Sequence, residues 1–149
     1  LDKGDFTVLS QANVLASFKN ILNILSIGLA AIAGISLIVG GIGIMNIMLV
    51  SVNERIQEIG LRKALGATSR DVGLQFLIEA VFISVIGGSI GLLIGFFLTL
   101  ASKRILNAEI PLWVVFVALG FSVAVGVVFG TYPALKAAKK DPIEALRYE

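Results

Sequence analysis

Charged residues divide the chain into three long apolar stretches. Residues 20–53, 80–102 and 110–135 contain no Asp, Glu, Lys or Arg. A charge at the bilayer centre costs roughly 2.5–3.5 kcal/mol, and a spanning helix needs about 20 apolar residues. The pattern therefore predicts an all-α integral membrane protein with three transmembrane helices, at about 23–52, 80–102 and 110–133.

The first stretch is longer than a bilayer requires. A helix over residues 20–53 would be about 51 Å long, against a hydrocarbon core of about 30 Å. With Ser10 as the N-cap, the sequence predicts a stalk at 10–22 that leaves the membrane and pairs with another helix. An amphipathic helix lying on the membrane surface is the alternative. The predicted pairing seam has the three- and four-residue spacing of a coiled coil: Leu15, Phe18, Leu22, Leu25, Leu29 and Ile32.

The third stretch carries an aromatic residue near each end. Trp113 and Tyr132 are 19 positions apart, or about 28 Å along a helix, which predicts one ring at each membrane interface. Pro111 suits the first turn of this helix, where a missing N–H costs nothing, and Pro133 suits its end.

The distribution of Lys and Arg predicts the orientation. The side that holds the loop 53–79 and the tail 134–149 has eight of these residues, and the opposite side has four. The positive-inside rule then places the start of the chain outside and its C-terminus in the cytoplasm. An outer N-terminus that begins at Leu1 predicts a fragment of a longer protein. Residues 5–9 are expected to be the last strand of a missing extracytoplasmic domain.

Composition removes several classes of function. The chain is 57% hydrophobic and 15% charged, with a mean hydropathy of +0.97, whereas soluble domains carry about 25% charged residues. With no Cys and no His, it lacks the usual metal ligands and nucleophiles, so no metal site, catalytic residue or bound cofactor is expected. A net charge of +2 gives no reason to expect nucleic acid. Because the interiors of the spans hold no Asp, Glu, Lys, Arg or His, an ion channel or proton-coupled carrier is disfavoured.

Glycines occur at spacings that allow close helix packing. Small residues four apart let helix backbones approach one another, which predicts contacts within the bundle or with a partner. Asn46, a polar residue deep in the first span, is expected to form an interhelical hydrogen bond. The glycines predicted to pack are Gly40, Gly41, Gly43, Gly87, Gly91, Gly95, Gly126 and Gly130.

The loop 53–79 carries helix signals of its own. Glu58 and Arg62 are spaced as an i,i+4 ion pair. A single helix through this region would place apolar residues on opposite sides, so we expect a break at Gly60 and a short helix over 61–65 that ends at Gly66. Such a helix, held between two spans, suggests a docking element. A solvated loop is the alternative.

Two further helix starts follow. Thr68 with Asp71 predicts a capping box at the start of the second span. In the tail, Asp141 and Pro142 predict the start of a short helix that continues through Arg147. Lys136, Lys139 and Lys140 lie where anionic headgroups are expected.

Four segments together resemble one family. GGIGIMNIMLVS at 40–51, EIGLRKALGA at 58–67, FLIE at 76–79 and PALKAAKKDPIEALR at 133–147 are similar to the C-terminal half of MacB-type ABC transporter permeases, in the FtsX-like permease family. The resemblance begins at about Ser10 and covers nearly the whole chain. Gln57 departs from it, because the family often has Arg at this position.

The resemblance implies a domain organisation. Such permeases have four transmembrane helices, with a large extracytoplasmic domain between the first and second. Residues 1–9 would then end that domain, and residues 10–149 would form the permease domain with helices two to four. The family's C-terminal tail motif would comprise Pro133, Ala134, Asp141, Pro142, Ala145, Leu146 and Arg147.

The resemblance also implies partners. Members form homodimers or heterodimers in the bacterial or archaeal cell membrane and bind an ABC ATPase subunit or domain that holds ATP and Mg²⁺. The resemblance does not decide whether an extracytoplasmic adaptor also binds. The family's coupling helix, which receives the ATPase motion, would comprise Glu58, Ile59, Gly60, Leu61, Arg62, Lys63, Ala64, Leu65, Gly66 and Ala67.

The leading hypothesis is the permease of an ABC exporter that moves macrolide-, peptide- or lipid-like substrates by mechanotransmission. No Walker A pattern occurs in the chain, so the ATPase is expected elsewhere. The alternative is an FtsX-like or lipoprotein-extracting scaffold that relays ATPase motion to extracytoplasmic partners. A third reading is a helical packing subunit without an ATPase, in which the coupling-loop match would be accidental.

Overall fold

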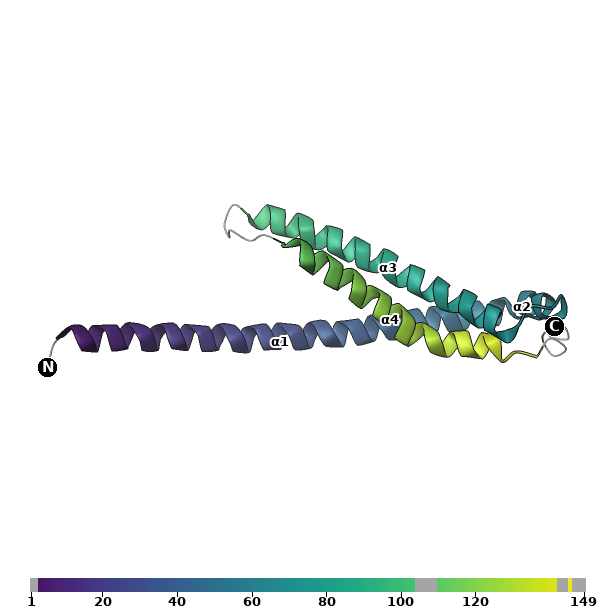
Figure 1. The fold of residues 1–149 in the computed structure, drawn as a ribbon, viewed down its shortest axis with the longest axis horizontal. Coiled ribbons are helices and arrows are strands. Elements are labelled where there is room, and N and C mark those ends of the chain that lie inside the picture. Colours follow the sequence, from purple (N-terminus) through teal and green to yellow (C-terminus); the bar gives the residue numbers. More distant parts are fainter. Residues whose placement is uncertain (1–2, 104–109, 142–144, 146–149) are drawn as a thin grey trace. The chain divides into compact units, whose positions relative to one another are not determined.

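The protein is mostly helical in the part that its structure, a computed structural model, describes: residues 3–103, 110–141 and 145. The helices are α1 (Lys3–Glu54), α2 (Ile56–Ala64), α3 (Ser69–Ser102) and α4 (Leu112–Ala138) (Figure 1). Three of them are long and apolar enough to cross a membrane: α1 from Asn13 onward, α3 and α4. The predicted all-α class with three candidate spans is confirmed.

The chain divides into two compact units, Leu1–Val39 and Gly40–Glu149. The first unit is the N-terminal part of α1. The strand predicted at 5–9 is wrong, because α1 begins at Lys3 and Ser10 lies inside it rather than capping it. A helix pairs its backbone groups within the segment, whereas a five-residue strand needs a neighbouring strand.

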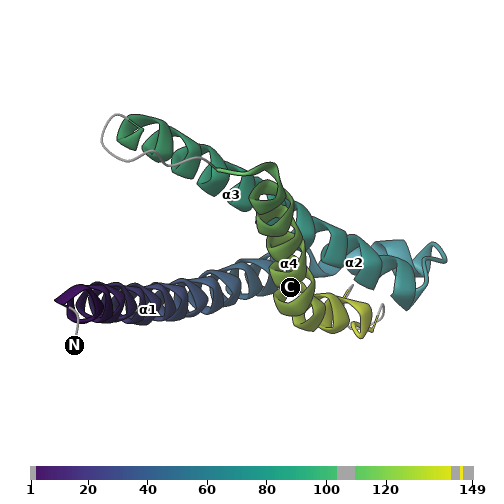
Figure 2. The same ribbon diagram turned by 60° about the vertical axis from the view of Figure 1, so that its left-hand side comes forward.

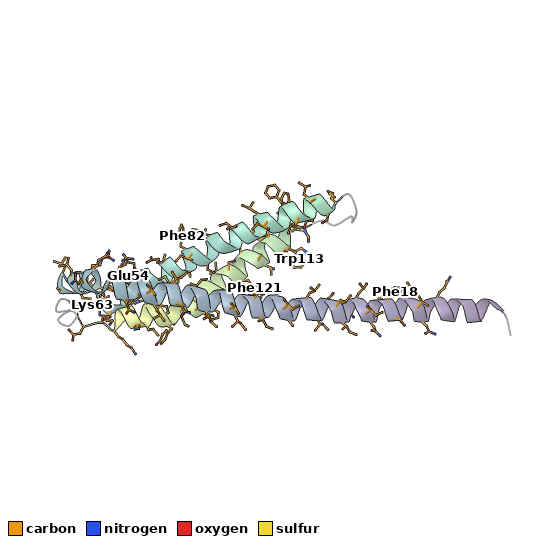
Figure 3. All side chains as sticks on the ribbon, turned by 180° about the vertical axis from the view of Figure 1, so that it is seen from behind. Phe18, Glu54, Lys63, Phe82, Trp113 and Phe121 are labelled. Atoms are coloured by element: carbon orange, nitrogen blue, oxygen red, sulfur yellow. The ribbon has the colours of Figure 1, made fainter. Side chains whose placement is uncertain are left out.

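The predicted seam of the stalk is exposed. Leu15 and Phe18 are 63% and 61% exposed, and Leu22, Leu25, Leu29 and Ile32 are likewise exposed. Figure 3 shows Phe18 projecting from the helix. Pairing of this seam with another helix therefore stays a prediction.

In the second unit, α3 and α4 form a hairpin that depends on two glycines of α4. A Cβ at Gly126 would lie 2.6 Å from the Cα of Val81, and one at Gly130 would lie 2.5 Å from the Cβ of Ala80. The hydroxyl of Ser84 donates a hydrogen bond of 2.5 Å to the Ser122 carbonyl across the same interface. These contacts require α3 and α4 to approach closely where small residues face each other.

The other predicted glycines differ in their surroundings. Gly41 lies against the ring of Phe129, and Gly88, which the spacing argument passed over, lies against Ser122. Five have no non-neighbouring heavy atom within 4 Å of a Cβ built on them: Gly40, Gly43, Gly87, Gly91 and Gly95. For these five, packing against a partner stays a prediction.

Helix α4 extends past its internal proline. Pro111, expected in the first turn, lies just before the helix at the N-cap position. Pro133 was expected at the end, but α4 continues to Ala138. Burial of Ala134 and Ala137 helps to offset the backbone hydrogen bond that Pro133 cannot donate. Trp113 and Tyr132 both lie on α4 and are exposed, and Figure 3 labels Trp113.

Buried side chains of the second unit gather at one end, which we call the base. There, α1 ends, α2 lies, α3 begins and α4 ends (Figures 1 and 2). The cluster draws residues from all four helices: Met48, Val52, Ile59, Val72, Phe76, Ala80, Ala134 and Ala137.

The glycine contacts make a testable distinction. Gly126→Ala must push the backbone of α3 away, at a cost of about 1–3 kcal/mol, whereas Gly91→Ala meets no atom of this chain. Thermal unfolding of the chain in detergent should therefore show a lower midpoint for Gly126→Ala and an unchanged or higher one for Gly91→Ala. Equal midpoints for the two variants would contradict the hairpin packing.

Candidate functional site

The junction between α1 and α2 lies at Arg55, not at Gly60. Arg55 has φ −104° and ψ 19°, outside helical geometry, while Gly60 is buried inside α2. The predicted break and the helix over 61–65 are therefore wrong. Leu61 and Leu65 do fall opposite the buried Ile56 and Ile59, but they are left exposed, so one helix accommodates both faces.

Arg55 contacts two helices of the base. Its Nε donates to Glu58 of α2 at 2.9 Å, and its Nη1 donates to Glu79 of α3 at 3.3 Å. The guanidinium carbon lies 5.5 Å from the centroid of the Phe76 ring, within cation–π distance. The residue at the junction of α1 and α2 is thus held by side chains of α2 and α3.

Glu58 and Arg62 form the predicted i,i+4 ion pair. Arg62 also donates to the amide oxygen of Gln75 at 2.5 Å, which gives α2 a second polar contact with α3. The hydrogen bond from Arg55, together with the charge of Arg62, lowers the pKa of Glu58 from its ordinary value.

Lys63 contacts two further elements. Its ammonium donates to the carbonyl oxygens of Ala138 at 2.6 Å and Lys140 at 2.8 Å, and to the hydroxyl of Ser69 at 3.1 Å. These acceptors lie at the end of α4 and at the first residue of α3. A cation beside the last carbonyls of a helix is favoured by the helix dipole.

The connection from α2 to α3 confirms two sequence predictions. Gly66 has φ +105°, the conformation typical of a glycine just after a helix. Thr68 and Asp71 form the full capping box: the Asp71 N–H donates to the Thr68 hydroxyl, and the Thr68 N–H donates to the Asp71 carboxylate at 3.0 Å. A short, defined turn therefore follows α2.

Two leucines are exposed on the outward face of α2. Leu61 is 53% exposed and Leu65 is 81% exposed, one helical turn apart. Ile56 and Ile59 on the opposite face are 6% and 2% exposed. Helix α2 is thus anchored on one face and presents two leucines on the other.

The remaining candidates, the tail motif and Asn46, are not among the polar contacts of α2 described above. In the tail motif, Pro133, Ala134 and Ala145 are buried, and the Ala145 N–H donates to the Asp141 carbonyl at 2.9 Å. Pro142, Leu146, Arg147 and the helix predicted through them lie outside the described residues. Asn46 lies on α1 in a shallow surface groove with Ser51 and Glu54. Among the described residues, no group of three His, Cys, Asp or Glu side chains could hold a metal ion.

Sequence reasoning gave no role to the partners on α3. Glu79, Gln75 and Phe76 all contact arginines of the α1–α2 region. Their spacing of three and four places them near one helix face. That periodicity could have indicated a common partner, although it could not identify which one.

The fold and the base define a class: a helical membrane protein with a short amphipathic helix held between two of its candidate spans. Residues 30–142 match the FtsX-like permease C-terminal family. The chain belongs to the FtsX-like permease family, and the resemblance to its MacB-type members is confirmed.

Several relatives are similar over nearly the whole chain. It is 51% identical over 99% of its length to the macrolide export ATP-binding/permease protein MacB of Bdellovibrio bacteriovorus, covering 23% of that protein. It is 48% identical over 97% of its length to the uncharacterized ABC transporter permease YknZ of Bacillus subtilis, covering 37% of that protein. It is also 46% identical over 99% of its length to the pyoverdine export ATP-binding/permease protein PvdT of Pseudomonas putida, covering 23% of that protein. The chain therefore spans well under half the length of these curated relatives.

The lowered pKa of Glu58 predicts a pH dependence. Stabilisation from a carboxylate with a lowered folded-state pKa is complete above the unfolded value, here 4.5, and is lost as the pH falls through the folded value. Amide hydrogen exchange of α2, corrected for intrinsic exchange, should therefore be constant from pH 7 to 5 and rise below pH 4.5. Glu58→Gln should exchange faster between pH 7 and 5, lack the Glu58-dependent rise and converge with the unaltered protein at low pH. A wild-type-like rise in this variant would contradict the role of the ion pairs.

Proposed function

We propose that this chain is the transmembrane permease part of a MacB-type ABC transporter and that α2 is its coupling helix. One observation carries the proposal: α2 is fixed to α3 by Arg55–Glu79 and Arg62–Gln75, yet exposes Leu61 and Leu65 on its other face. A helix that is held on one face and exposes two leucines on the other is suited to receive force from a partner protein. Family membership and the relatives named ATP-binding/permease proteins favour an ABC ATPase, with ATP and Mg²⁺, as that partner.

In this proposal, ATPase motion enters at α2 and passes to α1 through the Arg55 junction. The long helix α1 then carries the movement outward, toward an extracytoplasmic domain. The exposed seam from Leu15 to Ile32 pairs with a second permease subunit or another helix, because a row of exposed leucines along a helix favours association. Substrates are moved outside the membrane rather than through a central pore.

The proposed substrates are amphiphiles. Two relatives carry names that specify export, one of macrolides and one of pyoverdine, which favours an exporter. The second candidate is a scaffold that relays ATPase motion to extracytoplasmic partners. It is favoured by the same structural feature, because anchored α2 and long α1 would serve either output.

The docking face can be tested by a single polar substitution. Leu65→Gln should leave the protein in the membrane but reduce co-purification of ATPase activity with the full-length protein, by about tenfold for a central apolar contact. Leu74→Gln is the matched control, because it changes an exposed leucine of α3. Equal recovery of ATPase activity with both variants would contradict the proposal, and absence of any ATPase with the unaltered protein would favour the packing-subunit reading.

The proposed orientation places the α2–α3 turn in the cytoplasm and the loop between α3 and α4 outside. The sequence contains no cysteine, so single cysteines can be introduced cleanly. In intact cells, a membrane-impermeant maleimide should label Asn107→Cys but not Arg70→Cys, which should react only after permeabilisation. The reverse pattern would overturn the orientation.

A further inference from the structure

The ammonium of Lys63 uses all three of its donors. Lys carries three N–H groups and no acceptor, and its three partners here are the carbonyl oxygens of Ala138 and Lys140 and the hydroxyl of Ser69. Two of them are carbonyls at the last turn of α4 and just beyond it, about 75 positions further along the chain. One side chain of α2 thus binds the end of a different candidate span.

The polar contacts of α2 fall into two sets with different destinations. Arg55 and Arg62 bind Glu79 and Gln75, which are both on α3. Lys63 instead connects α2 to the end of α4. Figure 3 places Lys63 at the base, where α4 ends.

The contact between the Lys63 ammonium and the end of α4 is electrostatically favourable. The last carbonyls of a helix lack intrahelical donors and carry the negative end of the helix dipole. A charged donor there forms stronger hydrogen bonds than a neutral one. Because α4 ends at Ala138, Lys63 acts as a C-terminal cap supplied by another helix.

We infer that Lys63 is the positioning residue that links the coupling helix to α4, so that movement of α2 is delivered to the end of α4 as well as to α3. This inference rests on the proposed function, because it assigns a second output to the motion that α2 would receive. Apolar contacts of Ile59 with the base would hold α2 in place without this link.

The test uses the full-length protein with its ATPase in lipid nanodiscs, followed by hydrogen exchange with and without ATP and vanadate. Lys63→Met keeps the apolar stem but removes the charge and all donors. Lys63→Arg keeps the charge, but its planar fork cannot place three donors at one point, so it should restore the contact only in part. Lys139→Met is the matched control, because it removes an exposed lysine from the same end of α4.

In the unaltered protein, we expect nucleotide-dependent exchange in both α2 and residues 135–141. In Lys63→Met, the response of α2 should remain while that of 135–141 is lost, and basal exchange of 135–141 should rise at least about tenfold because charged hydrogen bonds are removed. Lys63→Arg should be intermediate and Lys139→Met should resemble the unaltered protein.

Two results would overturn the inference, and they are distinguishable. A nucleotide response of 135–141 that is equal in Lys63→Met and the unaltered protein would show that α4 receives motion by another route, while leaving α2 as the coupling helix. An unaltered protein in which α2 itself does not respond would overturn the proposed function and with it the inference.

Discussion

The free-energy cost of placing a charge in hydrocarbon determines where charged residues can lie in this chain. Within α3 and α4, the long central stretches contain no ionisable residue, so helix packing there depends on close approach and on hydroxyl groups that bond to backbone carbonyls. The ion pairs of Arg55 and Arg62 lie at the base. The base therefore combines a buried apolar cluster with a polar network that surrounds α2.

The two kinds of contact have different consequences. The α3–α4 interface depends on Gly126 and Gly130, where any added side chain meets backbone or a Cβ, so the hairpin geometry has little freedom. The contacts of α2 are made by partly exposed arginines and a lysine, whose individual contributions are small in water. Several such contacts together hold a short helix in a defined orientation while leaving Leu61 and Leu65 exposed.

Short-range features were predicted correctly from the sequence, but the position of the α1–α2 junction was not. The capping box at Thr68, the helix end before Gly66 and the Glu58–Arg62 pair each depend on residues within four positions of one another. The junction depends on Arg55 reaching Glu79, which is 24 positions away and on another helix. The break predicted at Gly60 came from the assumption that every apolar residue of this region must be buried. In the structure, Leu61 and Leu65 are exposed, so no break is needed.

The sequence by itself determined that the chain is helical and apolar, where its three candidate spans lie and to which family it belongs. Those properties follow from hydropathy, from charge placement and from contiguous motifs, all of which are read along the chain. Only the tertiary structure decided which glycines face a neighbour, where α1 gives way to α2 and that Lys63 caps α4. Helical periodicity places a residue on a face, but the packing of the hairpin decides which face meets another helix.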